Sequence, residues 1–238
     1  MLCIGHRGAK GHAPENTLKS IARALELGAG WVEIDVYYVD NHLVVIHDEK
    51  LKRTTNGKGY LADKSFSYLR SLDAGEGERI PTLEEVLDLI WKKAGINIEL
   101  KGPGTAKPVM DLLRKRITPG WGAENFLVSS FDHKMLYDVR KLDHSIRIGV
   151  LLDGVPVNYP AIAEELKAYS VNQNIRFINS KFVKDAHDRG FKVFVYTVNT
   201  HDDIKRMIAI GADGVFTDYP DRVLKLVQEE GTKQDLFC

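Results

Sequence analysis

Two acidic side chains, Glu33 and Asp35, occupy alternate positions in segment 31–36, whose other residues are apolar. Side chains alternate between the two faces of a β-strand, so a strand here places both carboxylates on one face. A third acid, Glu99, lies in segment 96–101, where polar and aliphatic residues also alternate. Carboxylate oxygens suit a hard cation such as Mg²⁺ or Ca²⁺ better than Zn²⁺. The three acids are therefore candidate ligands of one divalent cation, and structural ion pairs with basic residues are the alternative.

Two histidines and two basic residues lie at the ends of the expected strands. His6 and Arg7 end an apolar segment, His47 ends another, and Lys101 closes the segment that contains Glu99. Histidine changes its protonation near neutral pH, so His6 and His47 are candidates for a general acid and base. Hydrogen-bonded structural roles are the alternative for both histidines. Arg7 and Lys101 are expected to hold an anionic oxygen, arginine through two parallel contacts and lysine as a point charge.

A hairpin is expected to bring His47 to the acidic strand. After segment 31–36, a polar turn at Asp40 and Asn41 leads into the apolar run 43–46, which ends at His47. This gap is too short for a parallel crossover, which needs a dozen residues or more, so the two strands should be antiparallel. Folding the chain at the turn then places the imidazole close to the two carboxylates.

Strands and helices alternate along the chain and predict an α/β fold. Eight parallel strands, each followed by a helical pattern, favour a closed TIM (β/α)8 barrel with the antiparallel hairpin as an excursion after the second strand. The chain has 238 residues, close to the roughly 250 of a typical barrel, so we expect one domain over residues 1–238. The expected parallel strands lie near residues 2–6, 31–36, 96–101, 126–130, 147–152, 169–172, 192–198 and 214–217. The candidate residues fall at the carboxyl ends of these strands, where TIM barrels have their active sites.

The composition is that of an ordinary globular protein, with 44% hydrophobic and 28% charged residues and a formal net charge of +0. This balance favours neither nucleic acid nor an anionic membrane as a partner, so a local cluster of charge must hold any anionic ligand. The two cysteines do not suggest a disulfide scaffold. Met1 is followed directly by Leu2 without a basic segment, and no apolar stretch is long enough to span a bilayer. We therefore expect a cytoplasmic protein without stable membrane insertion.

A series of short motifs runs in order along nearly the whole chain. The motifs are His6-Arg7-Gly8, Pro14-Glu15-Asn16-Thr17, Glu33-Ile34-Asp35-Val36, His47-Asp48, Ile98-Glu99-Leu100-Lys101, Tyr196-Thr197-Val198-Asn199 and Gly214-Val215-Phe216-Thr217-Asp218. Each motif is weak alone, but the ordered set resembles that of the glycerophosphodiester phosphodiesterases. This resemblance implies a barrel that hydrolyses deacylated phospholipids, such as glycerophosphocholine, to sn-glycerol 3-phosphate and the free alcohol.

The resemblance also implies roles for eight residues. These roles are a divalent-cation site for Glu33, Asp35 and Glu99, an acid–base pair for His6 and His47, phosphate contacts for Arg7 and Lys101, and an alcohol-side contact for Tyr196. Tyr196 stands where many family members carry tryptophan. The segment from Glu49 to Pro81 is too short for the insertion domain of some periplasmic relatives, so the chain resembles the compact intracellular kind.

Two other functions remain open at this point. One is a lysophospholipase D activity on acyl-bearing substrates, which needs an apolar entrance; the polar segment from Arg53 to Gly59 disfavours it. The other is a catalytically silent barrel that only binds a phosphorylated ligand, which the presence of all the acidic, basic and imidazole side chains disfavours. The sequence does not distinguish Mg²⁺ from Ca²⁺, attack by water from attack by the neighbouring glycerol hydroxyl, or one head group or oligomeric state from another.

Overall fold

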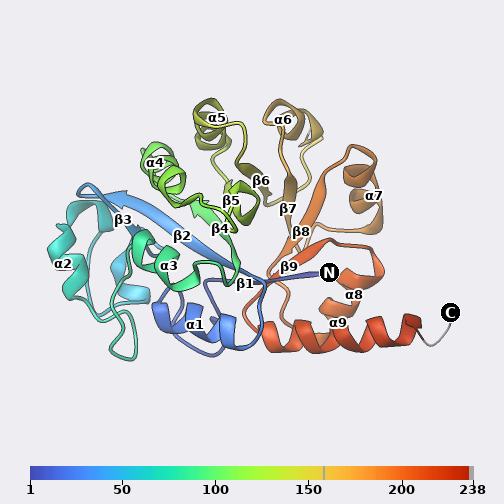
Figure 1. Cartoon of the computed structure of the whole chain (residues 1–238), viewed down its shortest axis with the longest axis horizontal. Coiled ribbons are helices and arrows are strands. Elements are labelled where there is room, and N and C mark those ends of the chain that lie inside the picture. The colour runs from blue at the N-terminus through green and yellow to red at the C-terminus, as the bar shows by residue number, and fades with distance from the viewer. Residues whose placement is uncertain (158, 236–238) are drawn as a thin grey trace.

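Eight parallel strands close into a barrel, and a ninth strand pairs outside it (Figure 1). The computed structural model describes residues 1–157 and 159–235. Around the barrel the strands run β1-β2-β4-β5-β6-β7-β8-β9, and β9 pairs again with β1, while β3 pairs with β2 alone. The strands are β1 (Leu2–Gly5), β2 (Trp31–Val39), β3 (His42–Val45), β4 (Gly95–Leu100), β5 (Phe126–Ser130), β6 (Arg147–Leu152), β7 (Ser170–Asn174), β8 (Lys192–Tyr196) and β9 (Gly214–Thr217). The predicted TIM barrel is confirmed.

Helices surround the strands, with α4 to α8 around one side of the barrel and α1 and α9 along another (Figure 1). The helices are α1 (Leu18–Glu26), α2 (Phe66–Ser71), α3 (Leu83–Ile90), α4 (Ala106–Arg116), α5 (His133–Leu142), α6 (Tyr159–Glu165), α7 (Ser180–Asp188), α8 (His201–Ala209) and α9 (Pro220–Asp235), with short 3₁₀ turns η1 (Leu51–Arg53), η2 (Leu61–Asp63) and η3 (Ala123–Asn125). Across residues 1–157 and 159–235, none of the helices is both long and apolar enough to span a membrane.

The helix ends follow from local chemistry. At the start of α1, the Thr17 side chain accepts a hydrogen bond from the backbone N–H of Ser20, which satisfies one of the free donors of the first turn. Gly28 follows this helix with φ at 91°, a left-handed conformation that glycine adopts without a steric penalty. Helix α3 ends at Ile90, because Trp91 leaves the helical conformation with ψ at 122° and Lys92 takes a left-handed φ of 57°.

The predicted antiparallel hairpin is confirmed and consists of β2 and β3. Its register pairs Val39 with His42 and Val36 with Val45, so strand β3 runs antiparallel to β2. The two turn residues, Asp40 and Asn41, have φ values of 48° and 61°. Positive φ at both positions gives the tight turn whose twist matches paired strands.

The alternation of side chains along β2 and β4 separates two environments. Val32 and Ile34 of β2, like Ile98 of β4, are fully buried in the large apolar cluster that the strands form with the helices. The alternate positions, which include Glu33 and Glu99, face the barrel interior. A smaller apolar cluster fills the interior below these polar side chains and consists of Ile4, Leu127, Phe194 and Phe216. The acids therefore lie above an apolar layer inside the barrel.

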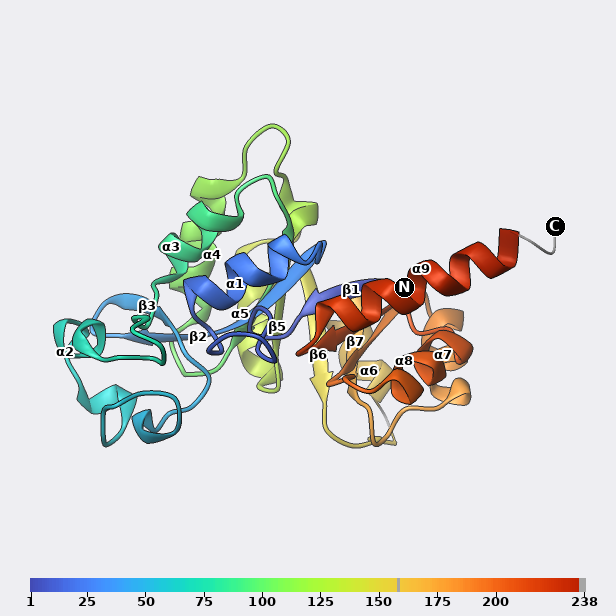
Figure 2. The same ribbon diagram turned by 90° about the horizontal axis from the view of Figure 1, so that it is seen from below.

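Segment 46–82, between β3 and α3, has a small apolar core of its own. The segment includes α2 and lies to one side of the barrel, apart from helices α6 to α8 (Figure 2). Its fully or almost fully buried side chains pack with one another and with the outer face of the hairpin; they include Leu51, Leu61, Leu69 and Ile80. This packing holds segment 46–82 beside the end of the barrel at which β2 extends into the hairpin.

Candidate active site

A cavity of about 170 Å³ opens at the carboxyl ends of the barrel strands. Seven of the eight predicted site residues line it: His6, Arg7, Glu33, His47, Glu99, Lys101 and Tyr196. The other lining residues are Asn97, Phe131, Leu151, Thr197 and Phe216. The eighth predicted residue, Asp35, lies beneath the lining and is 1% exposed. The structure thus brings all eight residues to one place, at the end of the barrel that carries active sites in this fold.

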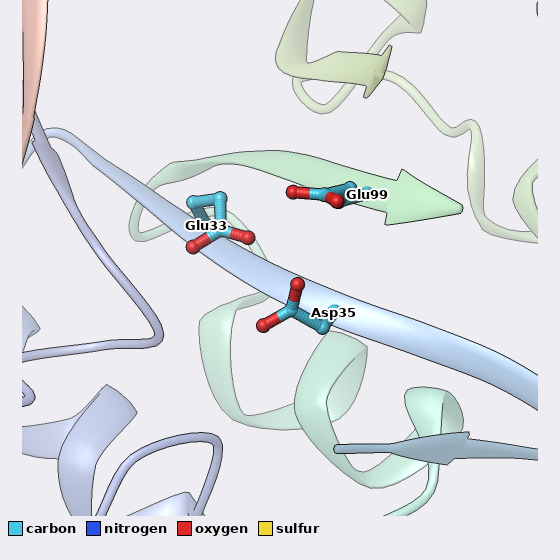
Figure 3. Close-up of side chains that lie close together, drawn as sticks. All are labelled: Glu33, Asp35 and Glu99. Atoms are coloured by element: carbon cyan, nitrogen blue, oxygen red, sulfur yellow. The ribbon is translucent and has the colours of Figure 1, made fainter. Parts of the chain in front are cut away.

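The three predicted metal ligands converge from two neighbouring strands. Glu33 and Asp35 project from β2 and Glu99 from β4, and the strand register pairs Asp35 with Glu99. One carboxylate oxygen of each residue lies within 4.8 Å of the other two. Figure 3 shows the three carboxylates around a common space. This arrangement could hold a single ion.

Both basic residues contact the acidic cluster. Lys101 Nζ donates a hydrogen bond to Glu99 Oε1 at 2.7 Å and lies 3.6 Å from Asp35 Oδ1. The backbone N–H of Arg7 donates to Glu33 Oε2 at 2.9 Å, and Arg7 Nε lies 3.3 Å from Asp35 Oδ2. The Nε–H of Arg7 is buried and has no well-aligned acceptor, although Asp35 Oδ2 lies nearby.

These ion pairs leave the cluster with one excess negative charge, because three carboxylates face two cations. Repulsion within the cluster contributes to the pKa shifts of Glu33 and Glu99. Burial, and then repulsion from Asp35 and Glu99, raises the pKa of Glu33 well above its usual range. Burial, and then repulsion from Asp35, raises the pKa of Glu99 to about 7, although Lys101 opposes the shift. Crowded like charges of this kind need either a proton or an additional cation.

A divalent cation fits this site on two grounds. The donor set consists only of carboxylate oxygens, which hard cations prefer. Burial, and then repulsion among the carboxylates, raises the pKa values of Glu33 and Glu99 in spite of Arg7 and Lys101, and a bound cation would relieve this repulsion. Structural ion pairs, the alternative considered from the sequence, are present but do not account for all three acids.

His6 forms a pair with a residue from the end of the last barrel strand. Its Nδ1 lies 2.6 Å from Asp218 Oδ1, and Asn199 Nδ2 donates to the other carboxylate oxygen at 2.9 Å. The carboxylate accepts the Nδ1–H, which leaves Nε2 of the imidazole as a proton acceptor. Burial lowers the pKa of His6, and the hydrogen bond with Asp218 opposes that shift. The geometry is that of a histidine oriented for proton transfer.

His47 has an equivalent arrangement. Its Nδ1 lies 2.5 Å from Asp48 Oδ1, and its Nε2 lies 3.3 Å from Lys101 Nζ. Burial lowers the pKa of His47 as well. Each of the two predicted acid–base residues therefore has a carboxylate partner on one nitrogen and reaches the cavity with its ring.

Tyr196 contributes its ring rather than its hydroxyl group to the cavity. The hydroxyl donates to the backbone carbonyl of Leu152 at 2.6 Å. The ring packs edge-on against Phe131, with 5.9 Å between the centroids, and Phe131 is 46% exposed at the cavity edge. The two rings form an apolar wall on the side of the cavity away from the β3 hairpin.

Comparison with known proteins agrees with this geometry. Residues 6–222 match the Glycerophosphoryl diester phosphodiesterase family. The chain belongs to this family. It is 40% identical to a glycerophosphodiester phosphodiesterase of Caldanaerobacter subterraneus subsp. tengcongensis over 240 residues, which cover 97% of this chain and 99% of that protein. A human lysophospholipase D is more distant, at 28% identity over 92% of this chain and 84% of that protein.

A solved structure shares the fold of this family member closely. It is an Oleispira antarctica phosphodiesterase in complex with the product sn-glycerol-3-phosphate, with a TM-score of 0.90 and 30% identity over 96% of this chain and 97% of that one. These matches make the protein a phosphoric diester hydrolase.

Five polar residues beside the site of this phosphodiesterase received no role from the sequence. They are Glu15, Asn16, Asp48, Arg53 and Asp218. Asn16, for example, donates from Nδ2 to Asp35 Oδ2 at 2.9 Å and accepts the backbone N–H of Asp35 at 3.3 Å. Four of the five stand within the short motifs that resemble the family, which was the available signal. Arg53 lies in the irregular segment after the hairpin, where no periodic pattern marked it.

Proposed function

We propose that this phosphodiesterase hydrolyses glycerophosphodiesters, such as glycerophosphocholine, to sn-glycerol 3-phosphate and an alcohol. In this proposal Glu33, Asp35 and Glu99 bind one divalent cation, Mg²⁺ or Ca²⁺. The observation that carries the proposal is the unbalanced buried carboxylate cluster beside two basic side chains that suit a phosphate. The Oleispira antarctica relative, solved with sn-glycerol-3-phosphate, supports a substrate that contains this half.

Charge balance favours this assignment. When all three carboxylates are ionised, they sum with Arg7 and Lys101 to one negative charge, so the ionised site without a metal would repel a phosphodiester anion. A bound dication changes this sum to one positive charge, which matches a phosphodiester with its single negative charge. The same dication would satisfy the carboxylates that otherwise retain protons near neutral pH.

The proposed mechanism depends on where negative charge develops. Cleavage of a phosphodiester increases charge on the non-bridging oxygens and on the leaving oxygen, so fixed cations at these oxygens lower the barrier. Arg7 contributes a guanidinium and Lys101 an ammonium, and both side chains line the cavity. A dication held by the acidic cluster would supply further positive charge there.

The two histidines are proposed to move the protons. One accepts the proton of the attacking hydroxyl, and the other donates a proton to the leaving oxygen, as general base and general acid. Asp218 and Asp48 hold the Nδ1–H groups of His6 and His47, so the Nε2 atoms would carry the transfers, that of His47 from a position 3.3 Å from Lys101 Nζ. These proton transfers are needed whether the attacking group is water or the neighbouring glycerol hydroxyl.

A coupled assay for sn-glycerol 3-phosphate tests this function. Several glycerophosphodiesters are supplied to the purified protein, first with a chelator and then with Mg²⁺ or Ca²⁺ restored. We expect activity to disappear with the chelator and to return with at least one of the metals. Full activity after chelation would overturn the metal assignment, and no product from any diester would overturn the proposed substrate class.

An assay for released choline, which both glycerophosphocholine and lysophosphatidylcholine would yield, separates the other two functions. Faster turnover of lysophosphatidylcholine than of glycerophosphocholine would favour the lysophospholipase D activity of the human relative. A barrel that only binds a phosphorylated ligand would turn over neither substrate. We further propose that residues 1–238 act as one catalytic domain, which the family match over residues 6–222 supports. A cytoplasmic location remains a prediction from the sequence.

A further inference from the structure

Arg53 joins two carboxylates, Asp48 and Glu15, that lie beside the proposed phosphate site. Its Nε and Nη2 donate to the two oxygens of Asp48 at 2.5 and 2.9 Å. Its Nη1 and Nη2 donate to the two oxygens of Glu15 at 2.9 and 2.7 Å. The planar guanidinium group thus uses two of its edges, each in a two-pronged contact with one carboxylate.

Each of these carboxylates in turn holds one residue of the proposed machinery. Asp48 Oδ1 lies 2.5 Å from His47 Nδ1. Glu15 Oε1 accepts a hydrogen bond from Arg7 Nη1 at 2.6 Å. Two chains of contacts therefore start at Arg53, one leading to the His47 imidazole and the other to the Arg7 guanidinium.

We propose that Arg53 is a positioning residue that fixes His47 through Asp48 and Arg7 through Glu15 at the same time. The inference rests on the proposed roles of His47 and Arg7 in the reaction. It gives the segment between β3 and α3 a function, because this segment delivers Arg53 to the site. Leu51, two residues earlier in η1, is fully buried in the apolar core of that segment and anchors the turn.

The contacts of Arg53 differ from an ordinary surface ion pair. Exposed pairs contribute only about 0–1 kcal/mol, since water screens them and both side chains lose freedom. Arg53 is 46% exposed, but its partner Glu15 is only 9% exposed and also carries the contact to Arg7. Hydrogen bonds from Arg53 and Arg7 lower the pKa of Glu15 to about 2 against the effect of burial. The carboxylate is thus a buried bridge between two arginines.

A lysine at this position could not replace the arginine fully. An ammonium group is a compact point charge, whereas the guanidinium presents several N–H donors in a fixed plane. The Arg53→Lys variant keeps the charge but is expected to satisfy one carboxylate at a time. A comparison of Arg53→Ala with Arg53→Lys therefore separates loss of charge from loss of geometry.

Steady-state kinetics with a glycerophosphodiester and saturating metal test the proposal. Asp48→Asn is expected to lower kcat, because His47 acts only during chemistry, whereas Glu15→Gln is expected to raise KM, because Arg7 also binds the ground state. Arg53→Ala should do both, each by about tenfold, as outer contacts of catalytic groups commonly do. Arg53→Lys should give intermediate values.

Double variants provide the deciding measurement. If Arg53 acts through Asp48 and Glu15, adding Arg53→Ala to Asp48→Asn should lower kcat little further, and adding it to Glu15→Gln should raise KM little further. Effects that multiply in both pairs, or wild-type kcat and KM in Arg53→Ala, would overturn the proposal. Wild-type kinetics in Arg53→Lys would overturn the geometric part and leave only a charge effect.

Controls separate this inference from the proposed function and from loss of folding. Arg189→Ala removes a similarly exposed arginine that pairs with Asp185 and Glu164 away from the cavity, and it should leave kcat and KM unchanged. Thermal unfolding of every variant shows whether it is folded at the assay temperature. If Arg53→Ala is unfolded there, Arg53→Lys and its double variants are used for the test instead. His47→Ala and Arg7→Ala are measured in parallel. Unchanged activity in these two would refute the proposed roles themselves, whereas loss of activity there with normal Arg53 variants would refute only the positioning role.

Discussion

The Nδ1 atom of His6 lies 2.6 Å from Oδ1 of Asp218, a residue 212 positions later in the chain. The closed barrel makes this pair, because β1 and β9 are neighbouring parallel strands and their carboxyl ends coincide. Asn199 holds the second oxygen of the carboxylate and so fixes the direction in which it faces the imidazole. The pair orients one of the two histidines at the cavity.

Replacement of Asp218 by Asn is expected to lower kcat by roughly a hundredfold or more. The carboxamide has the same shape, but its NH₂ group can be presented to the imidazole and would stabilise the wrong tautomer of His6. The measurement is kcat for sn-glycerol 3-phosphate release. The matched control is Asp221→Asn, since Asp221 pairs with His12 at 2.7 Å away from the cavity and should tolerate the change. Equal kcat values for the two variants would contradict a role for Asp218 in proton transfer.

The two functions of Tyr196 can be separated by two substitutions. Tyr196→Phe removes the hydrogen bond to the Leu152 carbonyl and should cost about 1 kcal/mol of stability. It should leave kcat and KM within a few-fold of wild type, because the ring stays against Phe131. Tyr196→Ala removes the wall itself and should raise KM for the glycerophosphodiester. Denaturant unfolding and steady-state kinetics check both, and a large loss of activity in Tyr196→Phe would indicate that the hydroxyl contacts substrate.

Gly8 permits the close packing of the loop that carries His6 and Arg7. Its φ is 84°, and a Cβ atom there would lie 2.5 Å from the carbonyl carbon of Ser20 in α1. Gly8→Ala should therefore destabilise the protein by about 2–4 kcal/mol, from both backbone strain and the clash. Gly190 is the control, because it has the same φ of 84° but nothing within 4 Å of the added atom. Gly190→Ala should cost only about 1 kcal/mol, and equal losses in the two variants would rule out the clash as the cause.

Local patterns in the sequence predicted much of this fold. The period-two alternation of 31–36 and 96–101 placed Glu33, Asp35 and Glu99 on the inner face, because the direction of a side chain in a strand depends only on its position. The turn at Asp40 and Asn41 was recognisable from residue type and spacing, which are also local features of the sequence. Eight strand–helix repeats then favoured a barrel, whose closure determines that the strand ends share one rim.

The pairs that orient the candidate catalytic groups were harder to predict. Asp218 lies at the end of the last strand, and its contact with His6 follows only once the barrel is known to close. Arg53 lies in a segment without periodicity, and its contacts with Glu15 and Asp48 depend on how that segment packs on its own small core. Such contacts depend on tertiary packing of loops rather than on local sequence.

The raised pKa of Glu99 predicts how the metal-free protein responds to pH. The unfolded chain loses this proton near the ordinary pKa of 4.5, whereas the folded protein retains it until about pH 7. Between these values the folded state binds more protons than the unfolded state, so the contribution of Glu99 to stability falls as pH rises. His6 and His47, whose pKa values are lowered, act in the opposite direction in the same range, so a single pH curve cannot isolate the effect.

Comparison of the wild type with Glu99→Gln measures the effect of Glu99 together with its repulsion of Glu33, because the two proteins share both histidines. In metal-free buffer, the free energy of unfolding of the wild type should fall relative to that of Glu99→Gln as pH rises from 4.5 to 7. Addition of Mg²⁺ or Ca²⁺ should reverse this trend in the wild type alone, since cation binding requires the ionised carboxylate and stabilises only the folded state. Urea unfolding at several pH values, with and without metal, provides the measurement. Parallel curves for the two proteins without metal would contradict the raised pKa, and equal stabilisation of both by metal would show that Glu99 is not a ligand.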